Sequence, residues 1–169
     1  MLSAIRNSDS KKVIGQMIDK NADESYYCER CHEKLIHHKS KSGIRIGHFK
    51  HNRESDCSNY KPMSYEHLET QFQIFKYISE NYKAVENIET EKWLGNNLIR
   101  ADVFLETKKG TKIGIEVQSS SISFDEISRR TELYVINNIY VFWVLLYDDS
   151  RFIDVDEEDE YNFHKKIKL

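Results

Sequence analysis

The chain has 169 residues, of which 39% are hydrophobic and 31% charged, and its formal net charge is −3 at pH 7. This length suits one compact domain, or a small domain joined to a mini-domain. Its apolar runs are far shorter than the ~20 residues that span a bilayer, and no signal-peptide pattern opens the chain. We therefore expect a cytoplasmic protein with no membrane partner, whose three cysteines are metal ligands or free thiols rather than disulfides.

The charge is unevenly distributed. Residues 1–64 hold 12 Lys and Arg against 8 Asp and Glu, together with five of the seven His, whereas residues 65–169 hold 13 against 20. Much of the acidic excess lies at Asp154 and in residues 156–160. The basic first third suits phosphate groups, although an ordinary solvated surface explains it equally well, and the acidic run is expected to be exposed.

Short segments precede Pro62, the only proline. Residues 12–18, 35–38 and 44–48 are expected to be strands, the last two around a turn at Ser42-Gly43. Such segments are too small to bury a core unaided. We therefore treat residues 1–62 as a separate module that needs another source of stability.

Five residues of this module are candidate zinc ligands. Cys28 and Cys31 form a Cys-x-x-Cys knuckle, and His48, His51 and Cys57 follow it. Structural zinc takes four ligands in tetrahedral geometry, commonly at short paired spacings. We favour Cys28, Cys31, His51 and Cys57, with His48 as the rival, and three unbound thiols are the alternative. A closed Zn²⁺ site would be structural, and its binding free energy would hold the module together.

Longer periodic elements follow Pro62. Ser64 is expected to cap a helix with apolar residues at positions 68, 72, 75 and 78, and Ser123 to cap a second helix that points Phe124, Ile127 and Leu133 inward. The predicted order is helix, three strands, helix, strand, with a short final strand. The ranges are helix 64–82, strands 85–93, 97–106 and 112–118, helix 123–136, strand 139–146 and strand 152–155.

Two carboxylates lie within apolar strand sequences. Asp102 belongs to Ile-Arg-Ala-Asp-Val-Phe-Leu and Glu116 to Ile-Gly-Ile-Glu-Val-Gln. A buried carboxylate needs a partner or a cation, and adjacent antiparallel strands would bring the two together. A divalent cation between them would allow both to ionise, and Mg²⁺ (or Mn²⁺) suits carboxylate and phosphate oxygens. Gln118 leaves the strand on the same face as Glu116 and is placed to orient a water or a phosphate.

Several of these segments resemble the competence protein CoiA-like family. They are Arg100-Ala-Asp-Val, Ile115-Glu-Val-Gln-Ser-Ser-x-Ile-Ser, the later residues Arg130, Tyr134 and Trp143, the knuckle Cys28-x-x-Cys31 and His48-Phe-x-His51. The resemblance covers roughly residues 25–147. It implies a restriction-endonuclease-like nuclease core of α+β or α/β class, with a mixed central sheet flanked by helices, beside an N-terminal zinc-finger-like module. The division becomes a zinc-finger-like module at 1–62, a nuclease-like domain at 63–155 and an acidic then basic tail at 156–169.

The resemblance also implies a function. It points to metal-dependent cleavage of DNA phosphodiesters, with Asp102 and Glu116 holding Mg²⁺ and Gln118 standing where the wider fold has a lysine. Because Gln118 is neutral, it positions water without supplying positive charge. The first helix in such folds often adds an acid, for which Glu66 is the candidate and Glu69 the competitor, and His67 lies in the same region as a substrate contact.

Other interpretations of the same residues stay open. In a purely structural interpretation, Asp102 forms a salt bridge with Arg100 or Arg130, and Glu116 is expected at an exposed edge of the sheet. Residues 129 and 130, both arginine, either bind phosphate or neutralise Glu126. A second hypothesis is a catalytically weak or inactive nucleic-acid-binding or assembly subunit on the nuclease scaffold. The residues do not separate DNA from RNA, and a protein partner or homo-oligomer would supply the substrate-guiding surface that so short a chain lacks.

Overall fold

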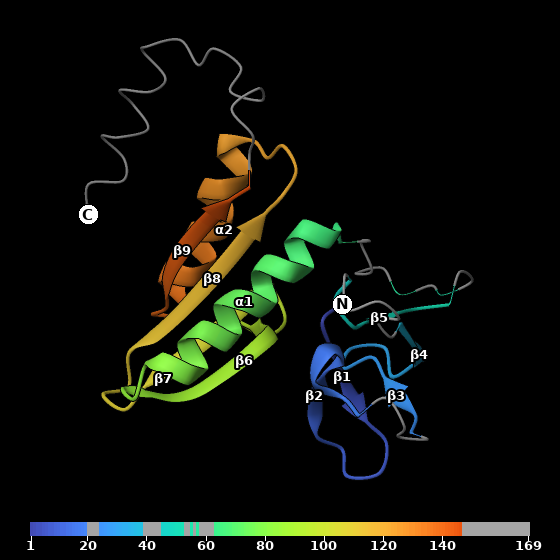
Figure 1. Ribbon diagram of the computed structural model, residues 1–169. Coiled ribbons are helices and arrows are strands. Elements are labelled where there is room, and N and C mark those ends of the chain that lie inside the picture. Colours follow the sequence, from blue (N-terminus) through green and yellow to red (C-terminus); the bar gives the residue numbers. More distant parts are fainter. Residues whose placement is uncertain (20–23, 39–44, 53–54, 56, 58–62, 147–169) are drawn as a thin grey trace.

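Two β-sheets and two α-helices make up the part of the chain that the computed structural model describes, namely residues 1–19, 24–38, 45–52, 55, 57 and 63–146 (Figure 1). The architecture is α+β. The predicted strand at 152–155 and the tail at 156–169 lie outside the described residues. Neither helix of the described chain is long and apolar enough to cross a membrane.

The first sheet is entirely antiparallel and contains five short strands in the spatial order β2-β1-β3-β4-β5. The prediction of a strand at 12–18 is wrong beyond Ile14, since a 3-10 helix follows at once. The chain turns there because Gly15 packs against Gly47, so closely that a Cβ on Gly15 would lie 2.8 Å from the Gly47 carbonyl oxygen. The first strand of the sheet was not predicted. The elements are β1 (Ser3–Arg6), β2 (Lys12–Ile14), the 3-10 helix (Gly15–Met17), β3 (Tyr26–Tyr27), β4 (Lys34–His38) and β5 (His48–Lys50).

The core of this sheet is small. Tyr26, Leu35 and Phe49 form one cluster with Cys28, and Leu2 and Ile46 form another with Leu68 of the first α-helix. The second cluster joins the small sheet to the rest of the chain. So little apolar burial agrees with the expectation that these segments need additional stabilisation.

The second sheet has the order β6-β7-β8-β9, with β8 and β9 parallel and the other pairs antiparallel. The predicted succession of helix, three strands, helix and strand is confirmed. Both predicted caps are also confirmed, since Ser64 Oγ accepts from the His67 N–H and Ser123 Oγ from the Glu126 N–H. The elements are α1 (Tyr65–Asn81), β6 (Val85–Leu94), β7 (Ile99–Thr107), β8 (Lys112–Gln118), α2 (Phe124–Ile136) and β9 (Tyr140–Leu145).

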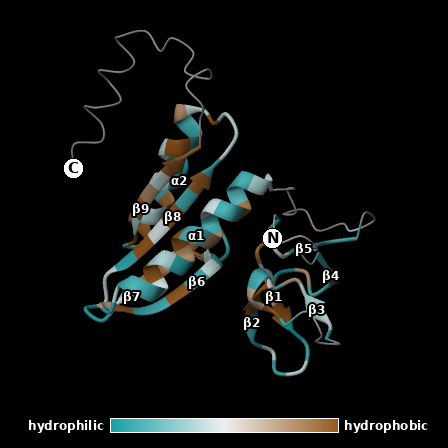
Figure 2. Cartoon of the chain, in the orientation of Figure 1, coloured by the Kyte–Doolittle hydropathy of each residue, from teal (hydrophilic) through white to brown (hydrophobic). Residues whose placement is uncertain are grey.

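The helices cover opposite faces of this sheet, with α1 in front and α2 behind in Figure 1. Apolar residues line the strands beneath them, whereas much of the α1 surface that faces the viewer is hydrophilic (Figure 2). The inward face of α2 differs from the prediction, because Phe124 is 38% exposed and Tyr134 is fully buried. Gly114 on β8 makes this possible, since a Cβ there would lie 2.5 Å from Cε1 of Tyr134.

Candidate active site and metal cluster

The two strand acids meet where β7 and β8 pair. Val103 lies opposite Ile115 in this antiparallel ladder, so Asp102 and Glu116 are the next residues along the same register. Both are buried, with exposed fractions of 5% and 1%. The alternative in which Glu116 lies at an exposed edge is therefore wrong, because β9 pairs with the other side of β8.

Asp102 is held by α1 and by β8. Its Oδ2 accepts a hydrogen bond of 2.8 Å from the Val117 N–H, and its Oδ1 lies 3.3 Å from Nε2 of His67. The fully buried Gln71 donates from Nε2 to the Asp102 carbonyl oxygen at 2.7 Å. Helix α1 thus reaches both the backbone and the carboxylate of Asp102.

Glu116 is held by two residues one turn apart on α2. The Tyr134 hydroxyl donates to Oε1 at 2.6 Å, and Nη2 of Arg130 lies 2.5 Å from Oε2. The Arg130 guanidinium stacks over Trp143, 4.9 Å from the ring centroid, and Trp143 donates from Nε1 to Thr131 Oγ1. The α2 helix therefore engages both oxygens of the carboxylate.

The acid pair is electrostatically strained. Burial is the main reason that the pKa of Glu116 rises to about 7, and the Asp102 charge raises it further, while Arg130 and Tyr134 lower it. Burial, followed by the Glu116 charge, also raises the pKa of Tyr134. A divalent cation beside the pair would relieve the repulsion and favour both ionised forms.

The structure pairs the arginines differently from the purely structural interpretation of the sequence. Arg100 lies 3.9 Å from Glu91, and Arg130 pairs with Glu116, so neither is the partner of Asp102. The reason is geometric, since Arg130 approaches from the helix that covers Glu116.

The remaining catalytic candidates lie at the end of β8 and in the first two turns of α1. Gln118 donates from Nε2 to the carbonyl and hydroxyl oxygens of Ser120, in the segment after β8. Glu66 is exposed on the first turn of α1, and the Glu69 carboxylate accepts from Tyr65 and Gln73 on α1 itself. Of the residues singled out on this helix, His67 is the one whose side chain lies beside the Asp102 carboxylate.

Two contributors, Gln71 and Glu91, were missed at the sequence level, and the role of a third, Tyr134, was not predicted. Gln71 lies on the apolar side of α1, three residues after Leu68, and a glutamine at such a position was an available signal. Tyr134 was noted only as a family resemblance, and its contact with Glu116 depends on the packing of α2. Glu91, described below, gave no signal in the sequence.

A second cluster lies in the small sheet. One donor atom from each of Cys28, Cys31, His51 and Cys57 lies within 4.8 Å of the others, and Cys31 Sγ is 3.3 Å from Nε2 of His51. None of the three cysteines is in a disulfide. These are the four residues that the sequence favoured as ligands, whereas His48 stacks on His38 and its Nδ1 contacts the Ile46 carbonyl oxygen.

The donors of this cluster suit zinc. Tetrahedral Zn²⁺ with bonds of ~2.3 Å places its ligand atoms roughly 4 Å apart, close to the spacing found here. Burial raises the pKa of the Cys31 thiol to about 12 and lowers the pKa of His51. The Cys31 thiol thus needs a cation to ionise, while the lowered pKa of His51 favours its neutral, metal-binding imidazole.

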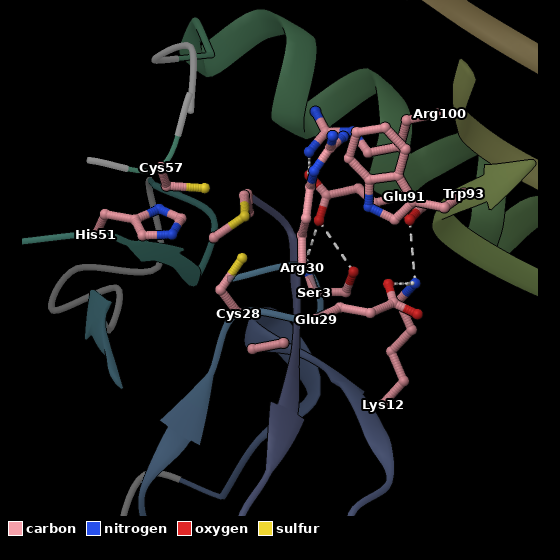
Figure 3. Close-up of a pocket in the computed structure, with 12 residues that line it drawn as sticks. Ser3, Lys12, Cys28, Glu29, Arg30, His51, Cys57, Glu91, Trp93 and Arg100 are labelled. Atoms are coloured by element: carbon pink, nitrogen blue, oxygen red, sulfur yellow. Dashed lines mark hydrogen bonds and ion pairs between the residues drawn. The ribbon is translucent and has the colours of Figure 1, made fainter. Parts of the chain in front are cut away.

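The two regions meet at Glu91 of β6. Its Oε2 accepts from both the N–H and the hydroxyl of Ser3, each at 2.9 Å, and Lys12 Nζ donates to its carbonyl oxygen (Figure 3). Burial opposes ionisation of Glu91, but Arg100, the terminal ammonium and Ser3 outweigh it and lower its pKa. Glu91 adopts a φ of +52°, a region that non-glycine residues avoid, so the contact to the small sheet is made at a strained position.

An arginine of the Cys-x-x-Cys knuckle reaches the same junction. Arg30 lies between Cys28 and Cys31, and its guanidinium is 4.5 Å from the ring centroid of Trp93 on β6. Arg100 approaches the same ring at 5.7 Å (Figure 3). The Cys–His cluster is therefore linked directly to β6, the strand next to β7.

The chain thus has an α+β fold with a mixed sheet, a buried acid pair and a Cys–His cluster. Residues 63–163 match the family described as competence protein CoiA, nuclease-like domain. Because this span exceeds half of the 169 residues, the chain belongs to that family, as the resemblance indicated. No curated protein and no solved structure gives a significant match.

Proposed function

We propose that this protein is a metal-dependent nuclease that hydrolyses DNA phosphodiester bonds, in the processing of incoming or foreign DNA. The observation that carries the proposal is the buried pair of Asp102 and Glu116 on adjacent strands of a nuclease-like domain. The order α1, β6 to β8, α2, β9 supports a restriction-endonuclease-like core.

The acid pair fits Mg²⁺ or Mn²⁺. Its donors are carboxylate oxygens, which such hard ions prefer, and their mutual repulsion is the reason that the pKa of Glu116 rises beyond the effect of burial. Asp102 and Glu116 would hold the ion. When bound, it would supply Lewis acidity to a phosphate oxygen and lower the pKa of a water.

The other residues of the site orient the two carboxylates. Val117 N–H and His67 fix the Asp102 carboxylate, and Tyr134 and Arg130 fix that of Glu116. Two carboxylates held in this way need little rearrangement when the substrate binds. A preorganised site gains much of its catalytic advantage by avoiding this rearrangement. Gln118 would orient a water through its amide.

We also propose a structural zinc ion at Cys28, Cys31, His51 and Cys57, within a zinc-finger-like module at residues 1–62. The nuclease-like domain would then occupy residues 63–155. A closed four-ligand site leaves no open position for a water, so this ion would stabilise the module rather than take part in hydrolysis.

The test is cleavage of labelled single- and double-stranded DNA and RNA in the presence of Mg²⁺ or Mn²⁺. Asp102→Ala and Glu116→Ala should each abolish turnover, whereas the control Asp125→Asn, at an exposed position on the first turn of α2, should not. Circular dichroism checks that each variant is folded. Cleavage that survives both alanine substitutions would refute the proposed site.

A non-catalytic DNA-binding or assembly subunit is the second candidate. It is favoured by the neutral Gln118 and by the occupation of both Glu116 oxygens by Tyr134 and Arg130. It predicts salt-dependent DNA binding without turnover. Calorimetric titration with Mg²⁺ separates the nuclease from the non-catalytic subunit. A degenerate site should give no heat of Mg²⁺ binding that depends on Asp102.

A further inference from the structure

We propose that Arg130 is the phosphate-binding cation of the acid site, bridging Glu116 and a non-bridging oxygen of the DNA backbone. This inference rests on the proposed function in that it assumes a nucleic-acid substrate at the acid pair. It assigns to a helix residue the positive charge that Gln118 cannot supply.

The contacts of Arg130 leave it able to bind an anion. Its Nη2 contacts Glu116, and its side chain is 24% exposed, so solvent reaches part of this side chain although it contacts a buried acid. Arginine has five N–H donors in a planar fork that matches the geometry of a phosphate. In the described part of the chain, Nη2 is the group of this fork that has a hydrogen-bonding or ionic partner, which leaves Nε and Nη1 for a ligand.

The guanidinium is also held in one orientation. It stacks over the Trp143 ring at 4.9 Å, and that ring is fixed in turn by a hydrogen bond to Thr131 on α2. Tyr134, one turn after Arg130, binds the other oxygen of Glu116. A cation whose plane is already fixed loses little entropy when a phosphate binds, which favours a specific contact over diffuse attraction.

The neighbouring groups do not offer the same charge. Gln118 is neutral and is hydrogen-bonded to Ser120. Arg129 pairs with Glu126 at 2.8 Å, with exposed fractions of 58% and 42%, on the surface of α2. Among the described Lys and Arg residues, Arg130 is the one that forms an ion pair with either acid of the site.

This contrast gives a matched control at the adjacent position. Arg130→Gln removes the charge at the acid site, and Arg129→Gln removes a charge of the same kind one residue away. Because Arg130→Gln leaves Glu116 without its buried partner, the key comparison is Glu116→Gln against the double variant Glu116→Gln/Arg130→Gln. That pair keeps residue 116 neutral in both members, so an unpaired buried carboxylate does not confound the result.

Binding is measured without cleavage, by fluorescence anisotropy of end-labelled DNA in Ca²⁺ with no Mg²⁺ or Mn²⁺ added. Relative to Glu116→Gln, the double variant should bind roughly tenfold more weakly and lose about one unit of the slope of log affinity against log salt. Arg130→Lys should recover part of the affinity, since it keeps the charge but not the fork. Arg129→Gln should stay within about twofold of the wild type.

A spectroscopic measurement reports on Arg130 itself. The chain has two tryptophans, so Trp93→Phe leaves Trp143 as the sole reporter, in contact with the guanidinium. Addition of the same DNA should change the Trp143 emission. The change should disappear when Arg130→Gln is added to that background.

The outcomes separate this inference from the proposed function. If the double variant binds DNA as tightly as Glu116→Gln, the Arg130 assignment is wrong even when the wild type cleaves DNA. If binding depends on Arg130 but neither Mg²⁺ nor Mn²⁺ gives turnover, the assignment stands and the nuclease proposal fails.

Discussion

The Cys–His cluster of the small sheet and the acid pair of the large sheet both bury groups that suit a metal ion, but they are supported in different ways. Cys28, Cys31 and Cys57 bring thiols together around His51 in a region with a small apolar core. Asp102 and Glu116 lie on paired strands between two helices, and each of their four oxygens lies within 3.3 Å of a protein nitrogen or hydroxyl oxygen.

This difference separates stability from chemistry. In the small sheet, the bonds to the proposed zinc ion would supply much of the folding free energy, since the burial there is modest. In the large sheet, protein donors hold the acids, and a bound ion would adjust charge rather than create the fold. We therefore expect loss of zinc to unfold the small sheet, and loss of Mg²⁺ to leave the fold of the large sheet intact.

The largest expected effect is loss of zinc from the small sheet. Cys28→Ser or a strong chelator should unfold the module around β1 to β5, because zinc binding of this type is worth on the order of 10 kcal/mol. Metal analysis and amide hydrogen exchange would measure this, with protection in β7 and β8 largely retained. His48→Ala is the control and should keep about one zinc per chain. A zinc-free protein with full protection throughout would contradict the proposed role.

Glu91 tests whether the two regions are independent. Glu91→Ala leaves the buried Ser3 N–H without its acceptor, so we expect a loss of about 2–3 kcal/mol in the free energy of unfolding. Urea denaturation measures it. Glu89→Ala on the same strand removes a partly exposed pair with Lys92 and should cost less than about 1 kcal/mol. If Glu91→Ala and Glu89→Ala lower the free energy of unfolding equally, the contact between Glu91 and Ser3 contributes little to stability.

The acid pair should make stability depend on pH when no metal is present. The pKa of Glu116 is raised from 4.5 to about 7 in the folded protein, so folding favours its protonated form. The contribution of Glu116 to the free energy of unfolding is therefore complete below pH 4.5 and is lost as the pH rises through 7. Thermal unfolding with no Mg²⁺ or Mn²⁺ added, from pH 4.5 to 8, should therefore show a falling Tm that Glu116→Gln flattens. Mg²⁺ at pH 8 should raise the Tm of the wild type by mass action.

The smallest effect is expected at Arg129. Its pair with Glu126 is exposed on both sides, so Arg129→Ala should change the free energy of unfolding by no more than about 0.5 kcal/mol. Arg130→Ala, which strips a buried carboxylate of its partner, should cost several times more. Chemical denaturation of the two variants side by side measures the difference. Similar values would mean that Arg130 does not hold Glu116.

Much of the large sheet follows from local sequence. Ser64 and Ser123 cap the two helices because a serine hydroxyl accepts from the N–H groups of a first helical turn. The strand acids stand out because a carboxylate in an apolar run needs a partner. The paired spacing of the cysteines with His51 likewise pointed to one metal cluster, since short loops bring such donors together. The short strands of the small sheet were harder to predict, because each has too few residues to show a period.

Tertiary structure alone decided which charged groups meet. Arg130 reaches Glu116 because α2 packs across β8 over Gly114, and Arg129, its neighbour in sequence, faces solvent. The contact of Glu91 with Ser3 joins residues 88 positions apart and depends on a backbone conformation that no residue pattern encodes. Periodicity and caps are local properties of a chain, whereas these pairings depend on strand register and helix packing, to which residues distant in sequence contribute together.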